Sequence, residues 1–159
     1  MSAVEVIAKV LDSGVLMPSL LYVPAEGASA EMIAEEERAL GRRLSPKHQA
    51  VLRRWNGINL EVLRMYGCGD TPPQVGRLSE NQGLDAWRVV GTAVGSDPAG
   101  FLYVEDDVGN ILSLDHDGGA IKKVAADLDD FFGRFVFGED AHLFGGDDWK
   151  EELRSLGML

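Results

Sequence analysis

The chain has 159 residues, of which 45% are hydrophobic and 26% are charged, a composition that is ordinary for a soluble globular domain. Its length suits a single domain, residues 1–159, and no apolar run approaches the roughly 18 residues that a membrane span needs. A single cysteine, Cys68, excludes an intrachain disulfide, and the start of the chain does not look like a secretory signal, so we expect a cytoplasmic protein.

The net charge of −11 is unevenly distributed along the chain. Residues 1–96 carry a net charge of −1, whereas residues 97–159 hold 15 acidic and 5 basic side chains, a net charge of −10. Nucleic acid is a poor partner for such a surface, because nucleic-acid binding relies on Lys and Arg displacing counterions. A basic protein, a metal ion or water alone remain as the surroundings that fit the acidic half.

The first part of the chain predicts three helices. Each begins at a serine that can act as an N-cap and ends near a glycine, which accepts the left-handed conformation of a helix end. These serines and glycines are Ser2 and Gly14, Ser29 and Gly41, and Ser45 and Gly57.

The second and third helices are expected to differ in their exposed faces. In Ala30–Leu40 we expect Ile33 to face the core and Glu36 to point elsewhere. Basic residues gather around the third helix, and we interpret them as a solvated face or as partners of the chain's own acids; they are Arg42, Arg43, Lys47, Arg53 and Arg54.

Short apolar runs separated by turn residues follow, a pattern that is typical of an antiparallel meander. Asp, Pro and Gly break the chain between the runs, because each favours a turn for its own stereochemical reason. The expected strands are Leu60–Tyr66, Arg88–Val94, Phe101–Glu105, Asn110–Leu114 and Ala120–Val124.

A helix with an aromatic stripe follows the meander. Asp127 is a good N-cap residue, and the apolar side chains at i, i+3, i+4 and i+7 are Leu128, Phe131, Phe132 and Phe135. We expect this stripe to be buried against the meander, the nearest surface that can cover it. Asp147 is expected to cap a last helix with Trp149, Leu153 and Leu156 on one face.

Residues for catalysis or metal binding do not have the spacing of known motifs. The three histidines, His48, His116 and His142, and Cys68 form no HxxxH, HExxH or CxxC pattern, so we predict no catalytic residue, metal site or cofactor. The aspartates at 106, 107, 115 and 117 could attract a hard cation, and a metal-dependent hydrolase built on them is an alternative. Hairpin turns explain the same aspartates more simply.

Residues spread over most of the chain resemble the SUKH superfamily, in particular its branch of fungal cell-wall assembly regulators and bacterial immunity proteins. The resemblance is clearest over residues 32–137, and Ser45 and His48 depart from the family pattern. The matching residues are Ile33, Glu37, Leu40, Gly41, Leu44, Pro46, Trp55, Asn56, Gly57, Gly91, Gly95, Asp97, Gly100, Gly109, Asp115, His116, Val124, Ala125, Leu128, Phe131 and Phe132.

The resemblance implies an α+β fold class, with helices packed on a curved, mostly antiparallel sheet. It also implies a non-enzymatic protein that binds and neutralises a protein toxin, or alternatively a regulatory scaffold of the same fold without a toxin partner. The acidic charge suggests that the partner is a basic toxin domain such as a nuclease. The residues expected to meet it lie in two acidic turns: Glu105, Asp106, Asp107, Asp115 and Asp117.

Overall fold

The computed structural model describes residues 1–83, 90–115, 117 and 119–159. Within this part of the chain, six strands form one sheet in which each strand pairs antiparallel with the next strand in sequence. The meander predicted between residues 88 and 124 is confirmed, although Arg88 and Val89 lie outside the described residues. The expected strand Leu60–Tyr66 is wrong, because residues 60–63 form a turn between two short strands in which the N–H of Leu60 donates to the carbonyl of Leu63. The strands are β1 (Ile58–Asn59), β2 (Arg64–Met65), β3 (Gly91–Ser96), β4 (Phe101–Asp106), β5 (Ile111–Asp115) and β6 (Ile121–Ala125).

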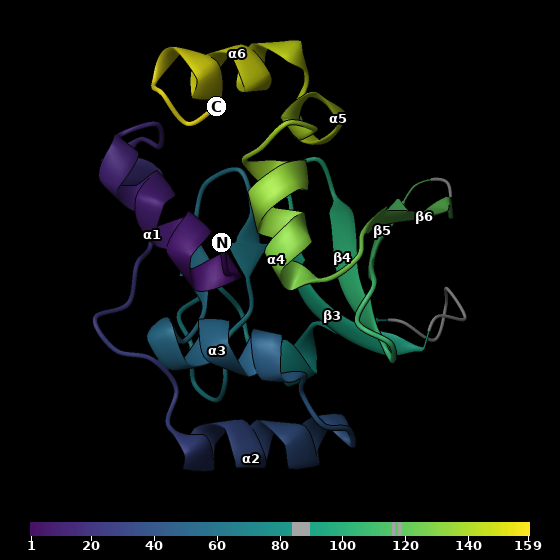
Figure 1. The fold of residues 1–159 in the computed structure, drawn as a ribbon. Coiled ribbons are helices and arrows are strands. Elements are labelled where there is room, and N and C mark those ends of the chain that lie inside the picture. The colour runs from purple at the N-terminus through teal and green to yellow at the C-terminus, as the bar shows by residue number, and fades with distance from the viewer. Residues whose placement is uncertain (84–89, 116, 118) are drawn as a thin grey trace.

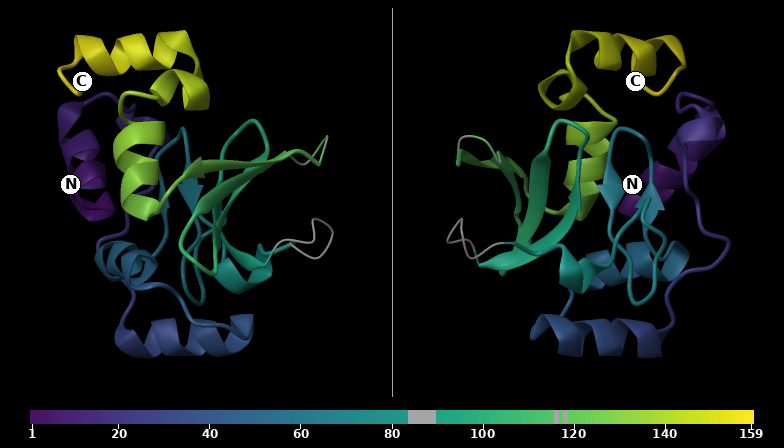
Figure 2. Two further views of the ribbon diagram at one scale, coloured as in Figure 1. Left: turned by 45° about the vertical axis from the view of Figure 1, so that its right-hand side comes forward. Right: turned by 180° about the vertical axis from the view of Figure 1, so that it is seen from behind.

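The sheet is curved and is not closed into a barrel, and the helices pack around it (Figures 1 and 2). This arrangement confirms the predicted α+β class. In Figure 1, α2 and α3 lie below the sheet, α1 and α4 lie beside it, and α5 and α6 lie above. The helices are α1 (Ala3–Ser13), α2 (Ala30–Leu40), α3 (Pro46–Arg54), α4 (Leu128–Asp130), α5 (Ala141–Gly145) and α6 (Asp147–Ser155).

Three predicted N-caps start α1, α2 and α3. The hydroxyls of Ser2, Ser29 and Ser45 each accept a hydrogen bond from the backbone N–H three residues later, and Glu5 completes a capping box with Ser2. Gly14 ends α1 with φ of 77°, the left-handed conformation that favours glycine. Local capping chemistry therefore sets both ends of α1 and α2. The predicted end of α3 at Gly57 is wrong, because its C-cap is Trp55 in an extended conformation.

The aromatic helix begins as predicted, with the Asp127 carboxylate accepting from the N–H of Asp130. It then continues as a π-helix, η4 (Phe131–Val136), in which the N–H of Phe137 donates to the carbonyl of Phe132. The wide turn is closed by Gly138, where a Cβ atom would come within 1.9 Å of the Gly133 carbonyl oxygen. The predicted stripe is buried: Leu128, Phe131 and Phe132 are 0% exposed and Phe135 is 6% exposed.

The two faces of the sheet belong to two apolar clusters. Side chains alternate along β4, so Tyr103 packs in the cluster that contains α1, η4 and α6, whereas Val104 packs in the cluster that contains α2. Both faces of the central strands are covered, which explains why these strands read as nearly continuous apolar runs.

The C-terminal segment departs from the prediction in two respects. α5 occupies part of a Gly- and acid-rich stretch in which no helix was predicted. Asp147 does not cap α6, because the N-cap position is Gly146, and Leu156 is 48% exposed although Trp149 and Leu153 are buried as expected.

The prediction that the Glu36 side chain, on α2, points away from the protein core is wrong. Its side chain is buried, and its carboxylate accepts from the N–H groups of Gly69 (3.1 Å) and Ser79 (2.7 Å) and pairs with Arg77 at 3.1 Å. Burial acts to raise the pKa of Glu36, but the hydrogen bonds from Ser79, Gly69 and Arg77 outweigh it and lower this pKa. Glu36 thus fastens the 69–79 loop to α2.

Removing the same atoms from a buried and an exposed leucine tests the aromatic-helix packing. Leu128→Ala should lower the free energy of unfolding by about 3 kcal/mol, because it leaves a cavity beneath α4. Leu143→Ala should change it by less than about 0.5 kcal/mol, since that side chain is 65% exposed. Urea denaturation measures both, and equal losses would contradict the described packing.

A second pair of variants tests the role of Glu36. Glu36→Ala should cost about 3 kcal/mol at pH 7, because it leaves two N–H groups and Arg77 without their acceptor. Glu35→Ala, on the exposed face of the same helix, should be nearly neutral. Because the pKa of Glu36 is lowered, its contribution should disappear as the pH falls below the ordinary carboxyl value of 4.5, and denaturation at several pH values would show this convergence.

Candidate functional site

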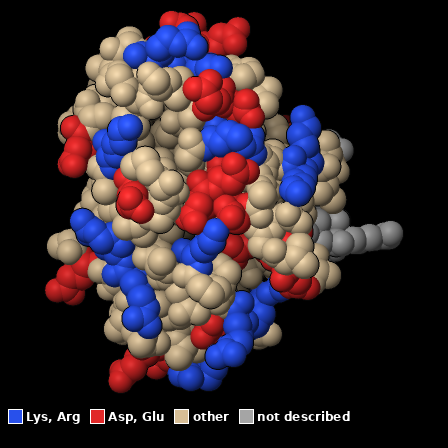
Figure 3. All heavy atoms as spheres, in the orientation of Figure 1, with Lys and Arg blue, Asp and Glu red and all other residues tan. Residues whose placement is uncertain are grey.

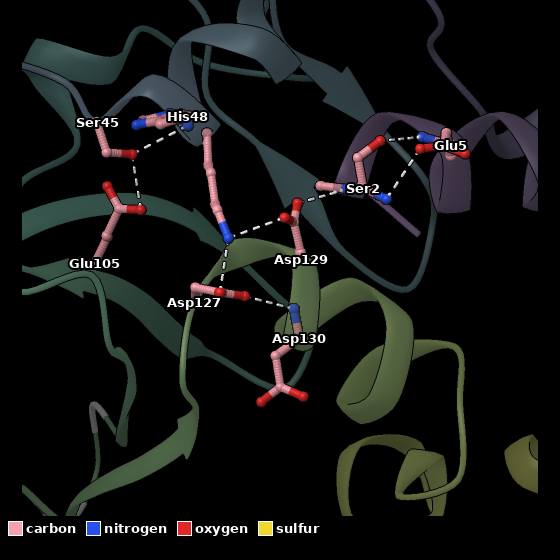
Figure 4. A network of polar contacts seen from close by, with 10 residues as sticks. Ser2, Glu5, Ser45, His48, Glu105, Asp127, Asp129 and Asp130 are labelled. Carbon is pink, nitrogen blue, oxygen red and sulfur yellow. Dashed lines mark hydrogen bonds and ion pairs between the residues drawn. The ribbon is translucent and has the colours of Figure 1, made fainter.

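Glu105, the first of the predicted partner-binding residues, is buried on β4. Its carboxylate accepts a hydrogen bond from the Ser45 hydroxyl at 2.9 Å, and the same hydroxyl accepts from the N–H of His48 (Figure 4). Burial raises the pKa of Glu105. This side chain joins β4 to the start of α3 and is not part of the exposed surface.

Asp106 and Asp107 occupy the turn between β4 and β5. The Asp106 carboxylate accepts from the N–H groups of Val108 (3.0 Å) and Asn110 (2.9 Å), so it holds the turn itself. The Asp107 side chain is exposed and pairs with Arg42, which also donates to the carbonyl of Gly91. Of these two acids, Asp107 is the one whose side chain is presented outward.

Asp115 and Asp117 lie at the turn between β5 and β6. The Asp115 carboxylate accepts from the N–H of Asp117 at 2.9 Å, and Asp117 itself is exposed. His116, between them, lies outside the described residues. Within the described part of the chain, no group of three or more His, Cys, Asp and Glu side chains could hold a metal ion.

The structure does not bring the two acidic turns together. β4 and β5 form a hairpin in which Glu105 pairs with Ile111 and Phe101 pairs with Asp115. The 106–107 turn therefore lies at one end of this hairpin and the 115–117 turn at the other, separated by roughly 15 Å of strand. A single partner surface cannot consist of these five residues alone.

Basic residues near α3 offset part of the acidic charge. Lys47 contacts the carboxylates of Asp127 (2.7 Å) and Asp129 (3.0 Å), and hydrogen bonds to them raise its pKa to about 12 (Figure 4). Figure 3 shows acidic side chains over α4 with basic ones beside them. The interpretation that the basic cluster pairs with the chain's own acids is confirmed for Arg42 and Lys47. The negative charge of residues 97–159 is therefore partly neutralised in the folded protein by basic residues from the first part of the chain.

A groove with a volume of about 740 Å³ lies between the sheet and the C-terminal helices. Its volume falls within the range of small-molecule and peptide sites, roughly 300–1,000 Å³. β4, β5 and β6 form one wall, and η4 and α5 form the other. Aromatic rings and Leu143 form much of the apolar lining: Phe101, Tyr103, Phe135, Phe144 and, at the rim, Leu143.

Most charged side chains around this groove already form hydrogen bonds or ion pairs with other residues of the chain. Asp97 accepts from the Tyr103 hydroxyl at 2.7 Å and from the N–H of Phe101. Arg134 donates to Asp130, to Asp140 and to the carbonyl of Val124. Lys122 and Lys123 on β6 are exposed and form no ion pair with any residue that the structure describes.

The sequence did not predict this groove. Of the five residues expected to meet a partner, Asp115 alone lines it. The residues that line it come from the turn between β3 and β4, from the strands β4 to β6 and from the helical segments α4, η4 and α5. These elements face one another because the sheet is curved. A signal was nevertheless present: two adjacent lysines occupy a strand directly before the aromatic helix.

Cys68 and His48, residue types that can act as nucleophile and base, are both buried. Cys68 is buried, and burial raises the pKa of its thiol to about 12, which keeps it protonated at neutral pH. His48 is fully buried, and neither ring nitrogen has a hydrogen-bond partner among the described residues. Burial lowers the pKa of His48 to about 4, so its imidazole is neutral.

His48 should make folding sensitive to mild acid. Between pH 6.5 and about 4 the unfolded chain binds a proton at His48 and the folded chain does not, so stability falls as the pH falls. Relative to His48→Leu, the wild-type protein should lose up to about 3 kcal/mol across this interval. Urea denaturation of both proteins at several pH values measures the difference, and parallel curves would show that His48 does not titrate this way.

No protein-family model matches the chain, and no curated protein is significantly similar to it. In the described residues, no helix is both long and apolar enough to cross a membrane.

Proposed function

We propose that this chain is a non-enzymatic, cytoplasmic protein-binding domain of the immunity type, which binds and neutralises a protein toxin. The observation that carries the proposal is the open groove with an aromatic floor on the curved sheet. Aromatic side chains are enriched at the centres of protein interfaces, because they bury a large area at a low cost in conformational entropy.

The rim of the groove also suits a protein partner. Leu143 is 65% exposed, so a large apolar side chain stands in water at the rim of the cavity. A partner that covers it removes apolar surface from water, which favours association. Together with the buried thiol and the neutral His48, the geometry favours binding over chemistry.

The acidic charge would act in encounter and orientation more than in direct contact at the groove. Asp107 and Asp117 remain exposed, and α6 adds the exposed acids Asp148, Glu151 and Glu152. Opposite charges speed diffusional encounter and orient the partner, so a basic toxin domain such as a nuclease fits this surface. Asp106 and Asp115 are held in their turns and contribute less.

The test is neutralisation of the toxin encoded by a neighbouring reading frame. Co-expression of this chain should restore growth, and calorimetry should show a complex. Leu143→Asp at the groove should weaken the complex at least about tenfold. Leu156→Asp, the same change on an exposed residue of α6, should leave it unchanged.

The contribution of charge is tested separately with Asp107→Asn/Asp117→Asn, which spares the two turn-forming aspartates. This variant should slow association several-fold and flatten its salt dependence. If the chain binds the neighbouring protein without relieving its toxicity, a regulatory scaffold would replace the immunity role. If it binds no such protein, the proposal fails.

A further inference from the structure

Among the residues that the structure describes, β6 is the outer strand of the sheet, because it pairs with β5 alone. In an antiparallel pair, opposing residues alternate between hydrogen-bonded and non-bonded positions. The N–H of Asp115 donates to the carbonyl of Ala120, which sets the phase of this alternation. The backbone N–H and C=O groups of Ile121 and Lys123 consequently point away from β5, toward the open edge.

One end of this edge is already blocked. The Arg134 guanidinium donates to the carbonyl of Val124 at 2.8 Å, and Asp130 and Asp140 hold Arg134 in place. The Ile121–Lys123 end has no such cover from the described residues. This free end lies beside the groove, since Lys122 and Lys123 both line it.

The charged side chains beside the free edge of β6 indicate which kind of segment binds there. The groove acids Asp97, Asp115 and Asp130 accept hydrogen bonds from neighbouring groups, whereas Lys122 and Lys123 form no ion pair with a described residue. Lys123 exerts a longer-range attraction on Asp130 that contributes to lowering the pKa of that carboxyl. Because Lys122 and Lys123 belong to the edge strand itself, carboxylates on an added strand would be the acidic groups nearest to them.

A second copy of this chain is a poor occupant. If two β6 strands paired with each other, Lys122 and Lys123 of one copy would lie against the same lysines of the other. Like charges directly across a strand pair are destabilising, and edge lysines are a common means of preventing self-association.

We propose that β6 takes up an extended segment of a protein partner as an additional antiparallel strand. The segment carries apolar side chains on one face, which enter the aromatic groove, and acidic side chains on the other face, which pair with Lys123, because successive side chains of a strand alternate between faces. Backbone hydrogen bonds to Ile121 and Lys123 supply affinity, and the groove and Lys123 supply specificity. The inference rests on the proposed function, since it names how the neutralised protein is recognised.

The test uses synthetic peptides and the isolated chain, without a toxin. An eight-residue peptide of alternating Val and Glu should bind about tenfold more tightly than one of alternating Val and Lys, as measured by fluorescence anisotropy. In the complex, hydrogen exchange should slow at the amides of Ile121 and Lys123. Equal affinities, or protection elsewhere in the chain, would overturn the proposal.

Charge-reversed variants provide the matched control. Lys122→Glu/Lys123→Glu should abolish the preference for the Val-Glu peptide, whereas Arg43→Glu/Arg53→Glu, with the same change in net charge on exposed residues near α3, should retain it. A loss in both variants would mean that net charge alone drives binding and would refute the edge-strand site. Neutralisation that survives the β6 reversal would refute this inference and leave the proposed function standing.

Discussion

Phe131 lies between the sheet and the rest of the aromatic cluster. Its ring centroid is 5.1 Å from that of Tyr103 on β4 and 5.2 Å from that of Phe132. Removing these rings from water is strongly favourable, and it can be achieved only if the chain folds back over the sheet directly after β6. The course of η4, and with it the positions of α5 and α6, follows from this burial.

Polar contacts around α4 then fix the helices relative to one another. Asp129 accepts from the N–H of Ala3 at 2.8 Å and pairs with Lys47, so one carboxylate links α1, α3 and α4 (Figure 4). Ser45 similarly links α3 to β4 through Glu105. Acidic residues that the sequence left available for a partner thus bind other parts of the same chain.

The groove is a consequence of the same geometry. η4 covers the sheet near β4, and the β5–β6 hairpin curves away from the helix (Figure 2). Among the aromatic side chains that line the groove between them, Phe101 and Phe144 are only partly buried. A surface of this kind costs free energy in an isolated monomer unless another molecule covers it. We therefore infer that its retention serves recognition, and that the open edge of β6 directs which segment is recognised.

The sequence by itself determined the elements whose causes are local. Serine caps, glycine stops, turn aspartates and the spacing of Leu128, Phe131, Phe132 and Phe135 act over a few residues, so the helices α1 to α3, the meander and the aromatic helix could all be predicted. Only the tertiary structure decided which charges are buried and which side chains meet. Glu36 was expected to point away from the core, and Glu105 and both acidic turns were expected to meet the same partner, because neither burial nor the strand that separates the turns is written in local spacing. The groove likewise exists only after the sheet has curved, since its walls come from segments that no sequence pattern places side by side.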